Sequence, residues 1–247
     1  MAHGSRDPRA AATASELLAV VRSRTRAWGL TGLEVKAAFL DHCAPSLPQV
    51  LGSVDSAGCV VVPLLLTAAY HSKTDIPAKL AAARVDVSCA DTLGPHPLLL
   101  AALERRLGEA GLPMGDRAAR ARTSVVLAAA GSSDPTANAT IAALAARWQA
   151  RGGWRAVVPA YASAAGPRPD DAVRALLAGG APGPVVVATY LLAPGFFADK
   201  IRAAGLRAGA AAVSPALGAA PEIADLILER YLTAVPAELC GPLAARA

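Results

Sequence analysis

The sequence repeats itself once, and this repeat limits the folds that the chain can adopt. Four short segments of the first half recur in the same order 122 to 127 residues further on. In chain order the pairs are 3–8 with 130–135, 35–39 with 157–161, 60–62 with 185–187, and 93–97 with 217–221. Such a period is far too long for a solenoid, whose units have about 20–50 residues. We therefore predict two similar domains, at residues 1–112 and 124–247, with a linker at 111–123 rich in Gly, Pro and Arg.

Within each copy, predicted strands alternate with predicted helices. In the first copy we expect strands at 33–40, 59–66 and 85–90, and helices at 8–28, 46–54, 75–83 and 97–110. In the second copy we expect strands at 124–129, 156–160, 185–192 and 210–213, and helices at 135–149, 172–177, 198–205 and 221–231. This alternation predicts the α/β class, with a parallel sheet in each domain and helices on both faces of it.

The two copies differ at their beginnings. The second has a full apolar strand, 124–129, ahead of its Gly-Ser-Ser-Asp-Pro loop, whereas the first has only Met1 and Ala2 ahead of His3. Two explanations stay open: the true start lies upstream, or the first domain has lost a strand.

Residues 60–77 combine a wholly apolar run with one histidine. Residues 60–66 suit a strand that is buried on both faces, and Asp75 followed by Ile76 and Pro77 suits the start of a helix. His71 would then lie in the loop at the carboxyl end of the strand, where open α/β sheets bind their ligands. The alternative is a loop histidine that merely bonds to backbone.

Two further candidate metal ligands follow predicted strands of the first copy. His3 follows the place of the first strand, and Asp41 follows the strand at 33–40. The fold would bring both to the sheet edge that carries His71. Two imidazoles and a carboxylate suit Fe, Co, Ni or Zn, and three protein ligands leave coordination positions open. His42 and Cys43 adjoin Asp41, and either could replace it as the third ligand or merely support it.

The second copy lacks all three candidate ligands. Ala130, Ser163 and Phe196 stand at the corresponding positions. This contrast predicts one metal site for the whole chain, in the first domain. Phe196 and Phe197 would give a wall for a large apolar ligand, although core packing is the alternative for both.

Composition excludes several other classes of protein. The net charge is +5, but the basic residues are scattered and lack interleaved aromatics, which argues against nucleic-acid binding. The apolar runs contain Pro or Gly and are too short to span a bilayer, and the first residues do not form a signal peptide. We expect a cytoplasmic monomer without a membrane or nucleic-acid partner.

Three motifs together resemble the class II chelatases, the two-domain sirohydrochlorin cobaltochelatases and ferrochelatases. They are His-Gly-Ser-Arg-Asp-Pro at 3–8, Ala-Phe-Leu-Asp at 38–41 with Pro-Ser-Leu at 45–47, and the segment from Val62 through His71 to Pro77. The resemblance implies two similar domains facing a cleft. It also implies insertion of Fe²⁺ or Co²⁺ into sirohydrochlorin, in sirohaem or cobalamin synthesis, with no permanently bound cofactor.

The resemblance also implies roles for particular residues. His3, Asp41 and His71 would bind the metal, and the two histidines would be catalytic. The family commonly has Glu where this chain has Asp41. The tetrapyrrole, an anion, would contact Ser5 and Arg6 together with the two phenylalanines at 196 and 197; for Arg6 the alternative is a solvated loop charge or a helix cap.

Two other functions use the same residues. A non-catalytic carrier of metal or tetrapyrrole would need the same His/Asp/His site. A hydrolase with His and Asp as base and orienter is a further alternative, but the sequence has no Gly-x-Ser-x-Gly motif to support it.

Overall fold

The chain divides into two compact units. A computed structural model describes residues 1–54, 59–67, 80, 87–180 and 182–235. Unit 1 comprises Met1–Gly94 and Ala219–Ala247, and unit 2 comprises Pro95–Gly218. His71 and nearly all of the predicted helix at 75–83 lie outside the described residues.

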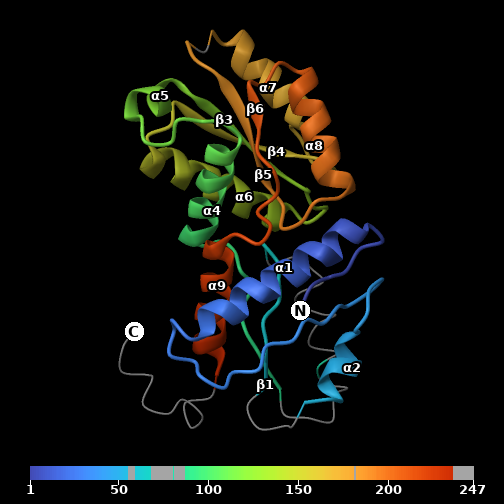
Figure 1. Ribbon diagram of the computed structural model, residues 1–247. Coiled ribbons are helices and arrows are strands. Elements are labelled where there is room, and N and C mark those ends of the chain that lie inside the picture. Colours follow the sequence, from blue (N-terminus) through green and yellow to red (C-terminus); the bar gives the residue numbers. More distant parts are fainter. Residues whose placement is uncertain (55–58, 68–79, 81–86, 181, 236–247) are drawn as a thin grey trace. The chain divides into compact units, whose positions relative to one another are not determined.

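Unit 2 is built on a four-stranded parallel sheet (Figure 1). The strands are β3 (Ser124–Ala129), β4 (Ala156–Tyr161), β5 (Val185–Tyr190) and β6 (Ala212–Val213), in the order β4-β3-β5-β6. Both β3 and β5 are buried along their whole length, as expected for strands covered on both faces. Ala129 aligns with Tyr161 on one side and with Tyr190 on the other, so these three strands end at the same level.

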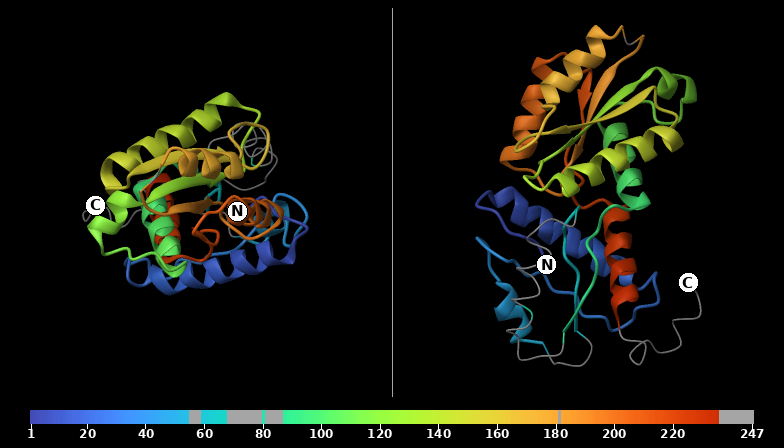
Figure 2. Two further views of the ribbon diagram at one scale, coloured as in Figure 1. Left: turned by 90° about the horizontal axis from the view of Figure 1, so that it is seen from above. Right: turned by 180° about the vertical axis from the view of Figure 1, so that it is seen from behind.

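Helices cover both faces of this sheet (Figure 2). The helices α7 (Pro169–Ala178) and α8 (Phe196–Arg207) pack on one face, where Val173 and Ile201 join Val126 and Val187 in the core. On the other face lie α4 (Pro97–Glu109) and α6 (Pro135–Gly152), joined by a 3.0 Å bond from Trp148 Nε1 to a carboxylate oxygen of Glu104. The predicted α/β class is confirmed.

Unit 1 has fewer paired strands. It contains α1 (Pro8–Thr25), α2 (Leu47–Leu51), β1 (Cys59–Val61), β2 (Val87–Cys89) and α9 (Pro221–Ala234), and β1 pairs in parallel with β2. The predicted strand at 33–40 was wrong in extent, because only Phe39 makes strand bridges, to Ala2 and Ser46. A strand needs a neighbour for its backbone groups, and most of this segment lacks one among the described residues.

The helices α1 and α9 lie side by side in unit 1 (Figure 1). Leu17 and Val21 of α1 are buried, as are Ile223 and Leu228 of α9. The Arg24 guanidinium donates two bonds to the Asp225 carboxylate, which also accepts a 2.9 Å bond from Trp28 Nε1. This carboxylate raises the pKa of the Arg24 guanidinium.

The compact units do not coincide with the sequence repeats. The last helix of the first repeat, α4, belongs to unit 2, and the last helix of the second repeat, α9, belongs to unit 1. The predicted linker also contains a helix, α5 (Arg117–Arg122), whose first amides donate to the Asp116 carboxylate. The boundaries 1–112 and 124–247 are those of the sequence repeats. As the boundaries of two similar domains they remain a prediction.

Candidate metal and substrate site

His3 stands in an exposed loop immediately before α1. Its Nδ1 lies 3.2 Å from the Gly4 carbonyl oxygen. A carbonyl oxygen only accepts hydrogen bonds, so Nδ1 carries the proton in this contact. Nε2 then carries the lone pair through which a neutral imidazole binds a metal. Gly4 has φ +93°, a conformation that favours glycine.

Asp41 lies next to His3, as the sequence predicts. Its backbone N–H donates to the His3 carbonyl oxygen over 2.9 Å. The Asp41 side chain is 62% exposed, and one of its oxygens lies 3.4 Å from Nε2 of His42. A solvent-facing carboxylate and a neighbouring imidazole are donor types that suit a divalent first-row metal. Asp41 and His42, two of the alternatives for the third ligand, are thus adjacent in the same loop.

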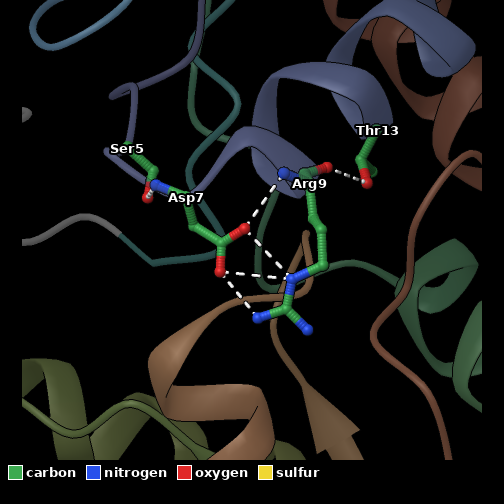
Figure 3. Close-up of polar contacts among 4 residues, drawn as sticks. All are labelled: Ser5, Asp7, Arg9 and Thr13. Carbon is green, nitrogen blue, oxygen red and sulfur yellow. Dashed lines mark hydrogen bonds and ion pairs between the residues drawn. The ribbon is translucent and has the colours of Figure 1, made fainter.

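Ser5 and the residues after it build the start of α1 (Figure 3). The Ser5 hydroxyl oxygen accepts a 3.1 Å bond from the backbone N–H of Asp7. Asp7 caps the helix by accepting from the Arg9 N–H, and its carboxylate also pairs with the Arg9 guanidinium at 2.6 Å. These bonds with Arg9 lower the pKa of Asp7. The Ser5 hydroxyl accepts one bond in this arrangement, and its proton can still be donated to a ligand.

Arg6 is exposed in the same loop. Asp7, and not Arg6, is the N-cap of α1, so the alternative role of Arg6 as a cap is wrong. An exposed guanidinium beside His3 suits an anionic ligand.

Unit 2 has the same pair of loops but lacks the imidazole and carboxylate side chains. The N–H of Ser163 donates to the Ala130 carbonyl over 2.8 Å, as Asp41 does to His3. Gly131 has φ +86°, close to the +93° of Gly4. The next residue after Asp41 and after Ser163 also has the same backbone conformation, with φ +60° at His42 and φ +58° at Ala164. The backbone is thus a property of the fold, and only the side chains distinguish the two loop pairs.

Phe196 and Phe197 begin α8 in unit 2. Their side chains are 73% and 37% exposed, and the rings meet edge to face with centroids 5.4 Å apart. Core packing is therefore wrong for Phe196. An exposed aromatic pair of this kind offers apolar contact area to a flat ligand.

The structure brings together one part of the predicted metal site. His3, Asp41 and His42 lie in adjoining loops of unit 1, and His71 lies outside the described residues. In that described part of the chain, no group of three or more His, Cys, Asp and Glu residues is arranged to hold a metal ion. The complete ligand set remains a prediction.

Sequence reasoning missed the role of Gly4. A Cβ at this position would come 1.8 Å from the Asp41 carbonyl oxygen, and one at Gly131 would come 2.1 Å from that of Ser163. The recurrence of this glycine in the repeat was the available signal. A glycine at this position allows the two loops of each unit to approach closely.

Comparison with known proteins identifies relatives across both repeats. The family model described as CbiX matches residues 1–110 and 124–234. A sirohydrochlorin cobaltochelatase of Priestia megaterium is 28% identical over 207 residues, which cover 81% of this chain and 65% of the relative. The chain therefore spans about two thirds of the length of that curated relative.

Solved structures share the fold. SirB from Bacillus subtilis with Fe³⁺ has a TM-score of 0.77 at 23% identity, over 96% of this chain and 94% of SirB. A structure described as CbiX, the terminal enzyme of sirohaem biosynthesis in denitrifying bacteria, has a TM-score of 0.67 at 23% identity, over 95% of this chain and 97% of that one. No helix in the described part of this chain is long and apolar enough to cross a membrane.

Proposed function

Because the chain belongs to the CbiX family, we propose that it is a sirohydrochlorin chelatase, a lyase that inserts Fe²⁺ or Co²⁺ into this tetrapyrrole. The relative from Priestia megaterium is a cobaltochelatase, and SirB structures contain Fe³⁺ or cobalt. The metal is a substrate of this reaction, and the pathway would be that of sirohaem or cobalamin. We further propose that the enzyme acts as a monomer in the cytoplasm.

The observation that carries the proposal is the contrast between the two loop pairs. Backbone bonds and dihedral angles are alike, but His3, Asp41 and His42 stand where unit 2 has Ala130, Ser163 and Ala164. A purely structural loop would not need imidazole and carboxylate groups in one copy alone. The donor set therefore belongs to the chemistry of unit 1.

In the proposed mechanism, His3 and His71 bind the metal and Asp41 supplies negative charge. Three protein ligands leave coordination positions open and hold the ion only moderately, so that it can leave for the macrocycle. Insertion releases two pyrrole protons, which the imidazole groups of the two histidines can accept. Asp41 has a shorter side chain than the glutamate common in the family, and His42 lies within 3.4 Å of it as the alternative third ligand.

Four residues are proposed as substrate contacts: Ser5, Arg6, Phe196 and Phe197. Arg6 and the Ser5 hydroxyl would meet carboxylates of the tetrapyrrole, since guanidinium binds carboxylate in a bidentate manner. Phe196 and Phe197 would contact its apolar ring system.

Spectroscopic turnover tests the proposal and separates it from a carrier function. Sirohydrochlorin and Co²⁺ are mixed with enzyme at one fiftieth of the substrate concentration, and the absorbance change is followed. Complete conversion indicates a catalyst, whereas a change that stops at one equivalent of protein indicates a carrier. Buffer without protein gives the spontaneous rate.

Matched variants then test the site. Asp41→Asn removes the charge from the unit 1 loop, and Ser163→Ala changes the corresponding side chain in unit 2. We expect Asp41→Asn and His71→Ala to slow chelation at limiting metal by about 10–100-fold, the usual size of an effect on metal sites. Ser163→Ala should retain the wild-type rate; full activity in His71→Ala would show that the ligand assignment is wrong.

A further inference from the structure

The carbonyl oxygen of Ser5 accepts a hydrogen bond from a side chain of the other loop at the candidate metal site. The Cys43 thiol donates to it over 3.2 Å in a partly buried position. The backbone N–H of Cys43 donates to the Asp41 carbonyl oxygen over 2.7 Å, so the thiol stands on the same turn as the proposed carboxylate ligand. The thiol bond therefore ties the loop that carries Ser5 and Arg6 to the loop that carries Asp41.

Unit 2 has the same two loops without this tie. Ser132 corresponds to Ser5, and Ala165 corresponds to Cys43. The Ala165 N–H donates to the Ser163 carbonyl oxygen over 2.7 Å, as the Cys43 N–H does in unit 1, so the backbone of the turn is alike. Alanine has no side-chain donor, and the Ser132 carbonyl must find its hydrogen bond elsewhere.

In unit 2 a helix holds this carbonyl instead. Nδ2 of Asn138, in α6, donates to the Ser132 carbonyl oxygen over 2.7 Å, and Oδ1 of Asn138 accepts from the Ser132 N–H over 3.0 Å. Ala11 stands at the corresponding position of α1, four residues after the Asp7 cap, just as Asn138 follows the Asp134 cap by four. The first loop is therefore tied to the second loop in unit 1, but to a helix in unit 2.

The two arrangements differ in strength and in what they connect. A thiol is a weak hydrogen-bond donor, whereas the Asn138 amide makes two ordinary hydrogen bonds. Firm attachment of the loop would thus be served better by the arrangement in unit 2, and it does not explain a thiol in unit 1. The thiol differs in its connection, because it fixes the loop with the proposed substrate contacts relative to the loop with the proposed metal ligands.

We propose that Cys43 is a positioning residue for chelation, which acts through the Ser5 carbonyl to hold Ser5 and Arg6 in a fixed position relative to Asp41 and His42. This inference rests on the proposed function. It assigns Cys43 a supporting role in place of metal ligation, because a thiol that donates its proton to a carbonyl group is not the thiolate that binds a metal. Metal and macrocycle must meet in one geometry, and a displacement of about 1 Å can reduce a rate about 100-fold.

Three variants of the full chain test the inference in the chelation assay. Cys43→Ala removes the donor. We expect kcat at saturating Co²⁺ and sirohydrochlorin to fall about tenfold, with each KM within about twofold of the wild-type value, because the groups that contact metal and tetrapyrrole stay in place. Cys43→Ser keeps a donor and should retain at least about half of kcat. Cys89→Ala removes an exposed thiol of β2 and, as a control, should leave kcat unchanged.

A double variant separates positioning from attachment of the loop. Ala11→Asn in the Cys43→Ala background gives unit 1 the helix-held arrangement of unit 2. We expect it to restore the Tm, which Cys43→Ala alone should lower by about 2 °C, but not to restore kcat. If the thiol only attached the loop, both quantities would recover together.

Recovery of kcat in the double variant would overturn the inference, as would a kcat of Cys43→Ala within about twofold of the wild-type value. So would a thiolate-to-cobalt charge-transfer band of the wild-type protein that Cys43→Ala lacks, because the thiol would then be a metal ligand. A wild-type protein without turnover would instead refute the proposed function. The thiol bond is then tested by the infrared S–H stretching band that disappears in Cys43→Ala, and a band at the frequency of a free thiol would overturn the inference.

Discussion

Substitution of Gly4 by alanine should damage the metal site through the backbone alone. A Cβ at Gly4 would come 1.8 Å from the carbonyl oxygen of Asp41, and contacts below 3.0 Å are essentially never seen. The two loops must therefore separate by more than about 1 Å, which is the scale of displacement that can reduce a rate about 100-fold. The bond from the Asp41 N–H to the His3 carbonyl lies in the same contact and would be disrupted.

The chain offers two matched controls for this prediction. Gly32 has φ +83°, and a Cβ there has nothing within 4 Å, so Gly32→Ala imposes the dihedral strain without the clash. We expect it to cost about 1–2 kcal/mol of folding free energy and no activity. Gly131→Ala imposes both strain and clash, at 2.1 Å from the Ser163 carbonyl, but in unit 2.

The assay is chelation of Co²⁺ by sirohydrochlorin, normalised to the folded fraction from urea unfolding monitored by circular dichroism. Gly4→Ala and Gly131→Ala should lose similar stability, more than Gly32→Ala does. Only Gly4→Ala should lose about 100-fold in kcat/KM at limiting metal. Equal activity of Gly4→Ala and Gly131→Ala, at equal folded fraction, would refute the reasoning that Gly4 positions the metal site.

Two further predictions concern unit 1. Asp225→Asn should lower the free energy of unfolding by about 1–2 kcal/mol, because the charged partner of Arg24 and Trp28 is lost at a partly exposed position. Urea unfolding measures this, with the exposed Asp171→Asn as a control that should change little. Burial raises the pKa of the Cys59 thiol above its ordinary 9.0, so the unfolded chain releases this proton first as the pH rises. Stability should then decrease as the pH rises through about 9 and above. Urea unfolding from pH 7 to 10.5 measures this decrease in stability. The decrease should be smaller in Cys59→Ala, and an unchanged decrease would contradict its attribution to the Cys59 thiol.

The sequence by itself determined the repeat, the α/β class and most helices. Local signals suffice for these features, since Asp7-Pro8 and Asp134-Pro135 mark helix starts and buried apolar runs mark β3 and β5. It also placed His3 and Asp41 together, because parallel strands end at one edge of a sheet.

Tertiary structure decided the features that depend on distant partners. The segment at 33–40 has the pattern of a strand, but a ladder forms only where a neighbour is present, and Ala2 reaches it only near Phe39. The assignment of α9 to unit 1 depends on packing against α1 and on the bonds between Arg24 and Asp225, 201 residues apart. The close approach of Gly4 to Asp41 likewise joins two loops far apart in the chain. A sequence pattern specifies which face of a segment is apolar, whereas the partner that covers this face is selected by the whole fold.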